Sequence, residues 1–220
     1  MELLQGIETR KSIRGFKSTP VPEDTIRNIL QLAGRSPSYT NTQPWEVAVV
    51  MGKKRDELSA ILYGLANSGV PANPDTPTPA SWPVELDKRA KEHGARRFNS
   101  LGMERHDAAA RNELRLMNFK FFGAPCALFL FMDGSLGPWS TFDMGLFTQS
   151  LALAAHGVGL GTCPQALLAH YPDAVREFLG LSKDRKLVLG VSLGYPDPAA
   201  KLNTYQSTRM NVEDFARWWK

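Results

Sequence analysis

Three basic side chains and a hydroxyl lie within five residues near the start of the 220-residue chain, at Arg10, Lys11, Ser12 and Arg14. Guanidinium, ammonium and hydroxyl groups are the donors that proteins use to bind phosphate oxygens. The cluster therefore predicts an anion-binding segment. A solvated basic segment would have the same composition, so this interpretation depends on other segments that complete a site.

A second segment, Ser36–Trp45, is rich in side chains that form hydrogen bonds, with the sequence SPSYTNTQPW. It lies between a predicted helix and a predicted strand. Such a loop could present hydroxyl and amide groups to a flat polar heterocycle. The alternative interpretation is an ordinary polar turn that leads into a buried strand.

A third segment, residues 161–166 (GTCPQA), follows a predicted helix. Pro164 has no backbone N–H, whereas the amides of Gln165 and Ala166 are available to point at a ligand, as at many helix starts. The alternative interpretation is a simple connection between a strand and a helix.

Two glycine patterns resemble catalytic motifs but lack the required context. Residues 190–194 (GVSLG) match the elbow of serine hydrolases, but a turn follows Ser192 instead of a helix, and all four histidines precede it. Residues 157–161 (GVGLG) resemble a dinucleotide-binding loop, yet they follow a predicted helix and not a strand. The histidines and cysteines lack metal-site spacing. The sequence therefore disfavours a serine hydrolase, a Rossmann site and a metal centre.

Apolar periodicity and helix-end residues predict the elements that position these segments. Helices are expected at 22–34, 54–66, 141–156, 172–179 and 212–219, and buried strands at 45–51, 126–132 and 186–193. The helix at 141–156 is apolar on most faces and is expected to be central and buried. Helices outnumber strands without strict alternation, so the predicted fold class is α+β, a central sheet wrapped by helices.

The composition changes between about residues 63 and 118. Five prolines within 71–83 predict a loop, and charged, helix-favouring sequence follows over 84–117, with breaks expected at Gly94 and Gly102. Long irregular segments in compact domains are usually functional lids or disordered. We therefore expect one domain, 1–220, with a variable substrate-side excursion at about 63–118.

The overall composition is that of an ordinary globular protein, and the net charge of +4 comes from dispersed basic residues. Dispersed charge disfavours nucleic acid and anionic membranes as partners. Both cysteines, Cys126 and Cys163, lie in apolar stretches, which disfavours a disulfide framework. Apolar runs are too short for a membrane span, and the first residues do not resemble a signal peptide. The expected location is the cytoplasm.

The order of the three segments resembles the FMN-dependent nitroreductase family. The chain has an opening R-K-S-x-R followed by a proline pair, then a helix, then P-S-x-x-N-x-Q-P-W before a strand, and later C-P-Q and an arginine at 209. The run P-S-x-x-N-x-Q-P-W is the specific part, because each element alone is common. The resemblance covers roughly 1–62 and 119–220. It implies a mostly antiparallel sheet and an intertwined homodimer.

The resemblance also implies how a non-covalent FMN would be held at its phosphate end. Arg10 and Ser12 would bind the phosphate and ribityl chain, with Lys11 nearby, and Arg209 would complete the phosphate contacts. Several relatives carry a lysine two residues before this last arginine, where this chain has Ser207. Phosphate binding would then be weaker, or Lys201 would compensate.

For the ring system, the resemblance implies contacts from both subunits. Arg14 would face the pyrimidine edge around N1 and O2. Pro164 and Gln165 would line one flavin face, with an amide of Gln165 or Ala166 donating to N5. The residues expected to reach the flavin of the other subunit are Pro37, Ser38, Tyr39 and Asn41.

The activity that the resemblance implies is ping-pong electron transfer from NADH or NADPH, through FMN, to a nitroaromatic or quinone-type acceptor. Because the cofactor carries the chemistry, no catalytic acid or base is implied. Two alternatives stay open: a specialised reaction on the same fold, such as reductive dehalogenation, and a non-enzymatic flavin-binding protein. The first needs a substrate clamp that does not align to 63–118, and the second would bind flavin without steady NAD(P)H oxidation.

Overall fold

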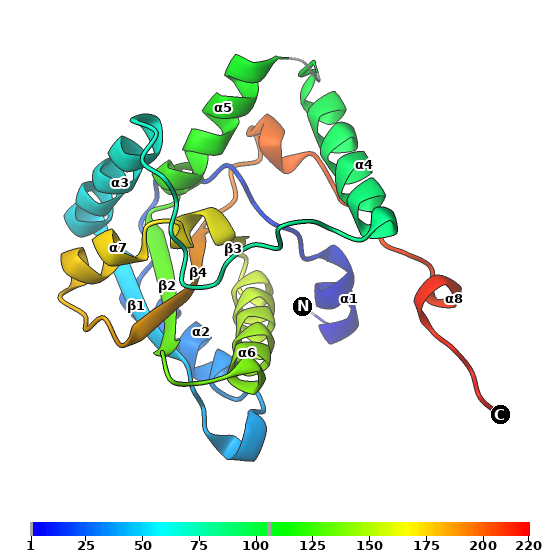
Figure 1. The fold of residues 1–220 in the computed structure, drawn as a ribbon, viewed down its shortest axis with the longest axis horizontal. Coiled ribbons are helices and arrows are strands. Elements are labelled where there is room, and N and C mark those ends of the chain that lie inside the picture. Colours follow the sequence, from blue (N-terminus) through cyan, green and yellow to red (C-terminus); the bar gives the residue numbers. More distant parts are fainter. Residues whose placement is uncertain (1, 105–106) are drawn as a thin grey trace.

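The computed structural model describes residues 2–104 and 107–220. Figure 1 shows a central sheet with helices on both of its faces. The sheet has four strands in the order β1-β2-β4-β3, and every neighbouring pair is antiparallel. The strands are β1 (Glu46–Met51), β2 (Cys126–Asp133), β3 (Gly161–Gln165) and β4 (Arg185–Gly194). The predicted α+β class with a mostly antiparallel sheet is confirmed.

Eight α-helices are found in the described residues: α1 (Leu3–Thr9), α2 (Glu23–Ala33), α3 (Gly52–Asn67), α4 (Val84–Leu101), α5 (Ala108–Leu116), α6 (Pro138–Gly157), α7 (Pro172–Leu179) and α8 (Val212–Phe215). Four short 3-10 helices join them: η1 (Tyr39–Asn41), η2 (Met117–Gly123), η3 (Ala166–Ala169) and η4 (Lys201–Asn203). Buried side chains of α3, α5 and α7 pack on one face of the sheet, and those of α2 and α6 on the other.

Strand β2 supplies side chains to both cores, because successive residues of a strand point to opposite faces. Each of its first seven residues is at most 1% exposed. Toward α3 and α5 lie Ala127, Phe129 and Phe131, and toward α2 and α6 lie Cys126, Leu128, Leu130 and Met132. A continuous apolar run in the sequence is therefore a strand covered on both faces.

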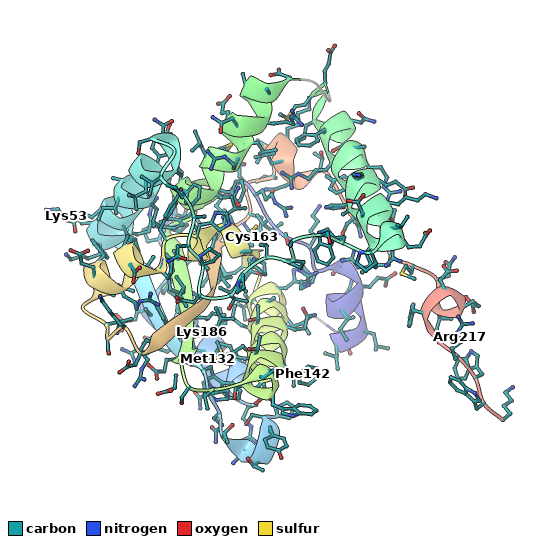
Figure 2. All side chains as sticks on the ribbon, in the orientation of Figure 1. Lys53, Met132, Phe142, Cys163, Lys186 and Arg217 are labelled. Atoms are coloured by element: carbon teal, nitrogen blue, oxygen red, sulfur yellow. The ribbon has the colours of Figure 1, made fainter. Side chains whose placement is uncertain are left out.

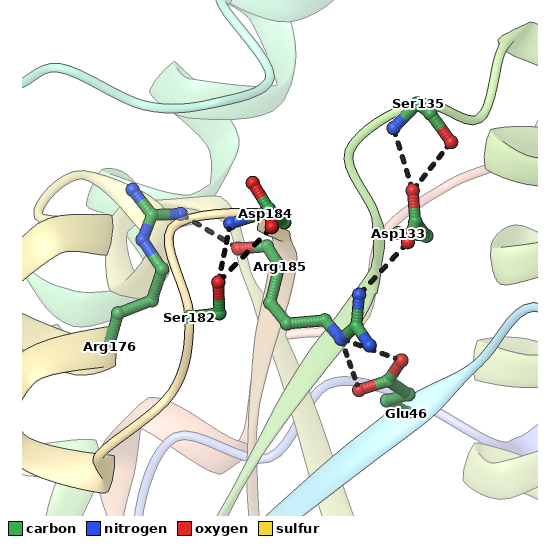
Figure 3. A network of polar contacts seen from close by, with 7 residues as sticks. All are labelled: Glu46, Asp133, Ser135, Arg176, Ser182, Asp184 and Arg185. Carbon is green, nitrogen blue, oxygen red and sulfur yellow. Dashed lines mark hydrogen bonds and ion pairs between the residues drawn. The ribbon is translucent and has the colours of Figure 1, made fainter.

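Arg185, the first residue of β4, connects three strands at one end of the sheet (Figure 3). Its guanidinium lies 2.9 Å from a carboxylate oxygen of Glu46 on β1 and 2.9 Å from one of Asp133 on β2. Its carbonyl accepts a hydrogen bond of 2.9 Å from Arg176 on α7. These contacts join α7 to the sheet.

Some features of the structure differ from the prediction. Helix α1 and strand β3 were not predicted; β3 is short, contains Pro164 and is defined by pairing with β4, and a proline is tolerated in such an edge strand. Helix α4 runs through Gly94 without a break, since one glycine costs only about 1 kcal/mol. The helix expected at 212–219 ends at Phe215, and Trp218 and Trp219 beyond it are exposed.

Helix α6 is buried along one side only. Met144, Phe147 and Leu151 contribute to the core, whereas Trp139 and Phe142 are 65% and 60% exposed. The expectation of a central, buried helix is therefore confirmed for one side of α6 and wrong for the other side in the single chain. An apolar surface of this kind needs a partner surface to cover it.

Of the helices in the described residues, none combines the length and apolarity that a bilayer span requires. Within the same residues, no three His, Cys, Asp or Glu side chains are grouped closely enough to hold a metal ion.

Candidate functional site

The Arg10–Arg14 segment runs along the outer edge of β3. Ser12 forms a parallel bridge with Thr162, and the backbone N–H of Ile13 donates to the Thr162 carbonyl at 2.9 Å. Gly161 makes this approach possible, because a Cβ there would lie 2.5 Å from Cγ1 of Ile13. The sheet thus fixes the direction of the basic segment.

Asn203 on η4 fastens the same segment from its other side, and no signal in the sequence indicated this role. Its Oδ1 accepts from the Arg14 backbone N–H at 2.7 Å, and its Nδ2 donates to the carbonyls of Gly15 and Asp197 at 2.8 and 3.0 Å. Its own carbonyl accepts from Nζ of Lys11 at 2.6 Å. The basic segment is therefore clamped between β3 and the C-terminal part of the chain.

The two ends of the basic segment open into different cavities. The first, the Arg10 pocket, has a volume of about 550 Å³ and contains Arg10, Lys11 and Arg209. Its other lining residues are Ile7, Glu8, Gln149, Gln206 and Ser207. Ser207 accepts a 2.6 Å hydrogen bond from Arg209, whereas Lys201 lies close to Gly102 and does not line this pocket. The structure therefore brings Arg10 and Arg209 together and leaves Lys201 apart.

The second cavity, the Arg14 pocket, has a volume of about 310 Å³ and is lined by Arg14 and the segment 164–166. Cys163, labelled in Figure 2, marks its position at the end of α6 and below α4 and α5. Its opposite wall contains Arg97 of α4 with Arg111 and Arg115 of α5. These three arginines were not predicted; the only signal for them was the charged helical sequence of the excursion.

The side chain of Gln165 is held inside the protein and is unavailable to a ligand. Ser192 donates to its Oε1, and its Nε2 donates to the carbonyl and side-chain oxygens of Asn118 at 3.2 Å each. Only backbone atoms of Gln165 can therefore serve the pocket. Ser192 itself is fully buried within β4, as the third residue from its end, which agrees with rejecting a hydrolase elbow.

The segment with Pro37, Ser38, Tyr39 and Asn41 lies away from both pockets. Tyr39 donates its backbone N–H to Asp143 at 3.1 Å and stacks on Trp139 at 5.7 Å, near the start of α6. Thr9, beside Arg10, contacts His156 near the end of α6. Asp143 and His156 are thirteen residues apart, or about 20 Å along a helix axis. Within one chain, this segment lines neither pocket.

Positive charge is concentrated across both pockets. Burial lowers the pKa of the Arg10 guanidinium, and the charge of Arg209 lowers it further. Burial, followed by the charge of Arg14, lowers the pKa of Arg97 in the same way. Cations that are brought together out of water are stabilised by a bound anion. The arrangement suits a ligand with an anionic end in the Arg10 pocket and a polar heterocycle in the Arg14 pocket.

Comparison with known proteins agrees with this geometry. A model described as the nitroreductase family matches residues 7–195. A 4-nitrobenzoate reductase of Pseudomonas putida is 34% identical over 212 residues, which cover 96% of this chain and 93% of that protein. The crystal structure of the FMN-dependent nitroreductase NfnB from Mycobacterium smegmatis in complex with NADPH is 34% identical, with a TM-score of 0.94 and complete coverage of both chains. That of an FMN and NADPH-dependent NfnB from Sphigopyxis sp. strain HMH is 31% identical, also with complete coverage of both chains, and has a TM-score of 0.96.

Proposed function

The chain belongs to the nitroreductase family, and we propose that it is an FMN-dependent enzyme that passes electrons from NADH or NADPH to nitroaromatic or quinone-type acceptors by a ping-pong mechanism. The observation that carries this proposal is the pair of basic pockets joined by the Arg10–Arg14 segment. One pocket suits a phosphate, and the other suits a flat heterocycle.

The donor set fits FMN. Arg10 and Arg209 supply guanidinium forks for a phosphate, and Lys11 keeps two N–H donors after its bond to Asn203. Ser12 lies between the pockets on the same segment, where a ribityl chain would pass. At the other end, Arg14 faces the space beside residues 164–166, which suits the pyrimidine edge of the ring.

FMN, when bound, supplies the redox chemistry by accepting a hydride from NAD(P)H and passing electrons to the acceptor. The chain binds and orients it. Arg14 would place its permanent positive charge at the N1–O2 edge and would stabilise the negative charge that reduction adds there. Pro164 would line one face of the ring, and a backbone amide of Gln165 or Ala166 would donate to N5. The buried bonds of the Gln165 side chain keep this backbone in place.

The absorbance spectrum of the purified protein tests the cofactor assignment. We expect a yellow protein that releases one FMN per chain on denaturation, and anaerobic oxidation of NADH or NADPH that depends on a nitro compound or a quinone. A protein that takes up no FMN contradicts the proposal. One that binds FMN but oxidises neither NADH nor NADPH in the presence of these acceptors supports the non-enzymatic alternative.

We also propose that the working form is a homodimer with flavin sites at the subunit interface. The distance along α6 between η1 and Arg10 supports this form, because Pro37, Ser38, Tyr39 and Asn41 would reach the partner's flavin and not their own. The exposed aromatic side chains support it as well. Phe142 faces outward from α6, and Trp218 and Trp219 are 74% and 87% exposed on a tail that leaves the body of the molecule (Figures 1 and 2).

Light scattering after size exclusion measures the oligomeric state. We expect Phe142→Glu to shift the protein toward monomer and to weaken FMN binding at the same time. Ile61→Glu is the matched control, since Ile61 is also exposed but lies on α3, across the sheet from α6. A monomer that retains its full flavin content would contradict the shared site.

The chain is proposed to be one domain, 1–220, in which the excursion at about 63–118 determines acceptor choice. The position of Arg97, Arg111 and Arg115 opposite residues 164–166 supports this role. Replacing residues 76–81 with a shorter linker should change the ranking of nitro and quinone acceptors while FMN stays bound. Loss of FMN with an unchanged ranking would instead indicate a structural role.

A cytoplasmic location is also part of the proposal. Both cysteines are free and buried, and burial raises the pKa of Cys126 to about 12, so it stays a thiol. Buried thiols of this kind are compatible with a reducing compartment. Cell fractionation with an antibody against the native protein would locate it; recovery from an oxidising compartment would contradict this assignment.

A further inference from the structure

The Arg14 pocket has an unbalanced charge. Among the residues that the structure describes, its lining includes four arginines and no acidic side chain. Two of the four already have a role: Arg14 faces the proposed cofactor, and Arg115 donates to the Ala66 carbonyl and to Asn112. Arg97 and Arg111 remain, and neither forms an ion pair with a carboxylate of the described residues.

Arg97 and Arg111 approach the pocket from two different helices, α4 and α5. The guanidinium carbon of Arg97 lies 5.9 Å from the ring centre of its neighbour Phe98, and Arg111 is exposed at the rim. Two guanidinium groups that line the same pocket from different helices can both donate to one planar anion. The FMN phosphate does not fill this role, because the Arg10 pocket accounts for it.

Apolar side chains complete the pocket. Phe98, Leu114, Phe122 and Leu167 line it together with the arginines. This combination suits an aromatic ring that carries an anionic substituent.

Building on the proposed reductase function, we propose that Arg97 and Arg111 bind a carboxylate on the acceptor, so that the preferred substrates are nitroaromatic acids. The ring would lie between the apolar walls, with its nitro group toward the segment 164–166. The 2′-phosphate of NADPH is a second possible anion. We favour the acid because that phosphate is on the adenosine ribose, far from the nicotinamide, whereas the two arginines line the same small pocket as residues 164–166.

The test compares 4-nitrobenzoate with 4-nitrobenzamide, a neutral molecule of nearly the same shape. We expect the FMN-loaded protein to have a higher kcat/KM for the acid under anaerobic conditions. Arg97→Gln and Arg111→Gln should each lower the acid-to-amide ratio of kcat/KM by about tenfold or more, the loss expected for one charge-assisted hydrogen bond. Lys88→Gln removes a charge from an exposed position of the same helix α4, outside the pocket, and should leave the ratio unchanged.

Calorimetry provides a readout that does not depend on turnover. Benzoate should bind to the oxidised, FMN-loaded protein more tightly than benzamide. Arg97→Gln and Arg111→Gln should weaken benzoate binding, and so should added salt, because screening reduces the attraction between charges. Equal affinity for benzoate and benzamide would overturn the inference.

Three other outcomes would also overturn it, and two of them identify a different occupant. An unchanged acid-to-amide ratio in both arginine variants means that the pocket does not read the carboxylate. A fall in the NADPH-to-NADH ratio of kcat/KM instead assigns the arginines to the donor phosphate. Loss of FMN from both variants assigns them to the cofactor.

Failure of the proposed function has a separate signature. If the native protein reduces neither the nitro compounds nor a quinone but binds benzoate through Arg97 and Arg111, the reductase assignment is wrong and the anion site stands. If it reduces both compounds equally and binds no benzoate, the reductase assignment stands and the anion site is wrong.

Discussion

Arg14 and Arg97 line the same pocket, but the segments that carry them are held in different ways. Arg14 follows the buried Ile13 on a stretch that is bonded to β3 on one side and to Asn203 on the other. Arg97 is on α4, a helix without a single buried residue, which contacts the C-terminal segment through a hydrogen bond of 3.1 Å between His93 and Tyr205.

This contrast separates two walls of the Arg14 pocket: a rigid wall, formed by the Arg10–Arg14 segment, and an adaptable wall, formed by helix α4. A wall fixed by buried backbone bonds keeps its donors in place before a ligand arrives, which lowers the entropic cost of binding. A helix with few buried contacts has low local stability and can shift at little cost. The rigid wall faces the proposed cofactor, which is the same in every turnover, and the adaptable wall faces the proposed acceptor, which varies.

The largest expected effect concerns the point where the adaptable wall is anchored. Asp75, in the proline-rich loop, pairs with the buried Arg176 of α7 and accepts from the Leu187 backbone N–H at 2.8 Å. Figure 3 shows Arg176 beside the sheet. Asp75→Ala leaves this buried guanidinium without its main partner. The substitution should reduce the free energy of unfolding by about 3 to 5 kcal/mol. Urea unfolding measures this.

Asp173 provides the control for Asp75. It also pairs with Arg176, but its side chain is 70% exposed, so Asp173→Ala should cost at most about 1 kcal/mol. Equal costs for the two variants would show that the loop is not anchored at Asp75. A loop deletion intended to change acceptor choice must therefore begin after this residue.

The next effect distinguishes redox tuning from simple binding on the rigid wall. Arg14→Ala removes a charge-assisted bond worth about 1.5 to 3 kcal/mol to the reduced flavin, and should lower its midpoint potential by on the order of 30 to 60 mV. Arg10→Ala should instead weaken FMN retention, because the phosphate keeps its charge through the redox cycle. Spectroelectrochemical titration separates the two; an unchanged potential in FMN-loaded Arg14→Ala removes Arg14 from the ring site.

A smaller effect is expected from Asn203, which fastens the Arg10–Arg14 segment. Asn203→Ala removes the side-chain bonds to Arg14, Gly15 and Asp197, and should raise the dissociation constant of FMN by about tenfold. Thr204→Ala, next to it, removes only a local bond to Lys201 and should have little effect. Fluorescence titration of the apoprotein with FMN measures both. Equal affinities would mean that β3 alone positions the basic segment.

The smallest expected effect concerns His93 of α4, which forms a hydrogen bond with Tyr205 of the C-terminal segment. Burial, then the charges of Arg97 and Arg14, lowers the pKa of His93 below its ordinary value of 6.5. Below about pH 6.5 the unfolded chain takes up a proton that the folded chain does not, so stability is lost as the pH falls toward the folded-state pKa. His93→Gln should reduce this loss between about pH 7 and 5. Identical pH profiles of stability for the two proteins would show that the pKa of His93 is not lowered in the folded protein.

Local patterns in the sequence were sufficient to predict the helices and strands that have strong apolar periodicity. The apolar run at 126–132 and the amphipathic patterns at 22–34 and 172–179 each match an observed strand or helix within two residues. The prediction failed where the neighbours decide the structure: β3 exists because β4 pairs with it, and the apolar pattern at 212–219 finds no core within its own chain to pack on.

The sequence by itself determined the family, the fold class and the residues that converge on the two pockets from the basic segment, residues 164–166 and Arg209. Their types and order are recorded along the chain. Only the tertiary structure placed Arg97, Arg111 and Asn203 beside them and set η1 apart at the far end of α6. Such contacts join residues that are distant in sequence, and they follow from how helices and strands pack together, which no local pattern encodes.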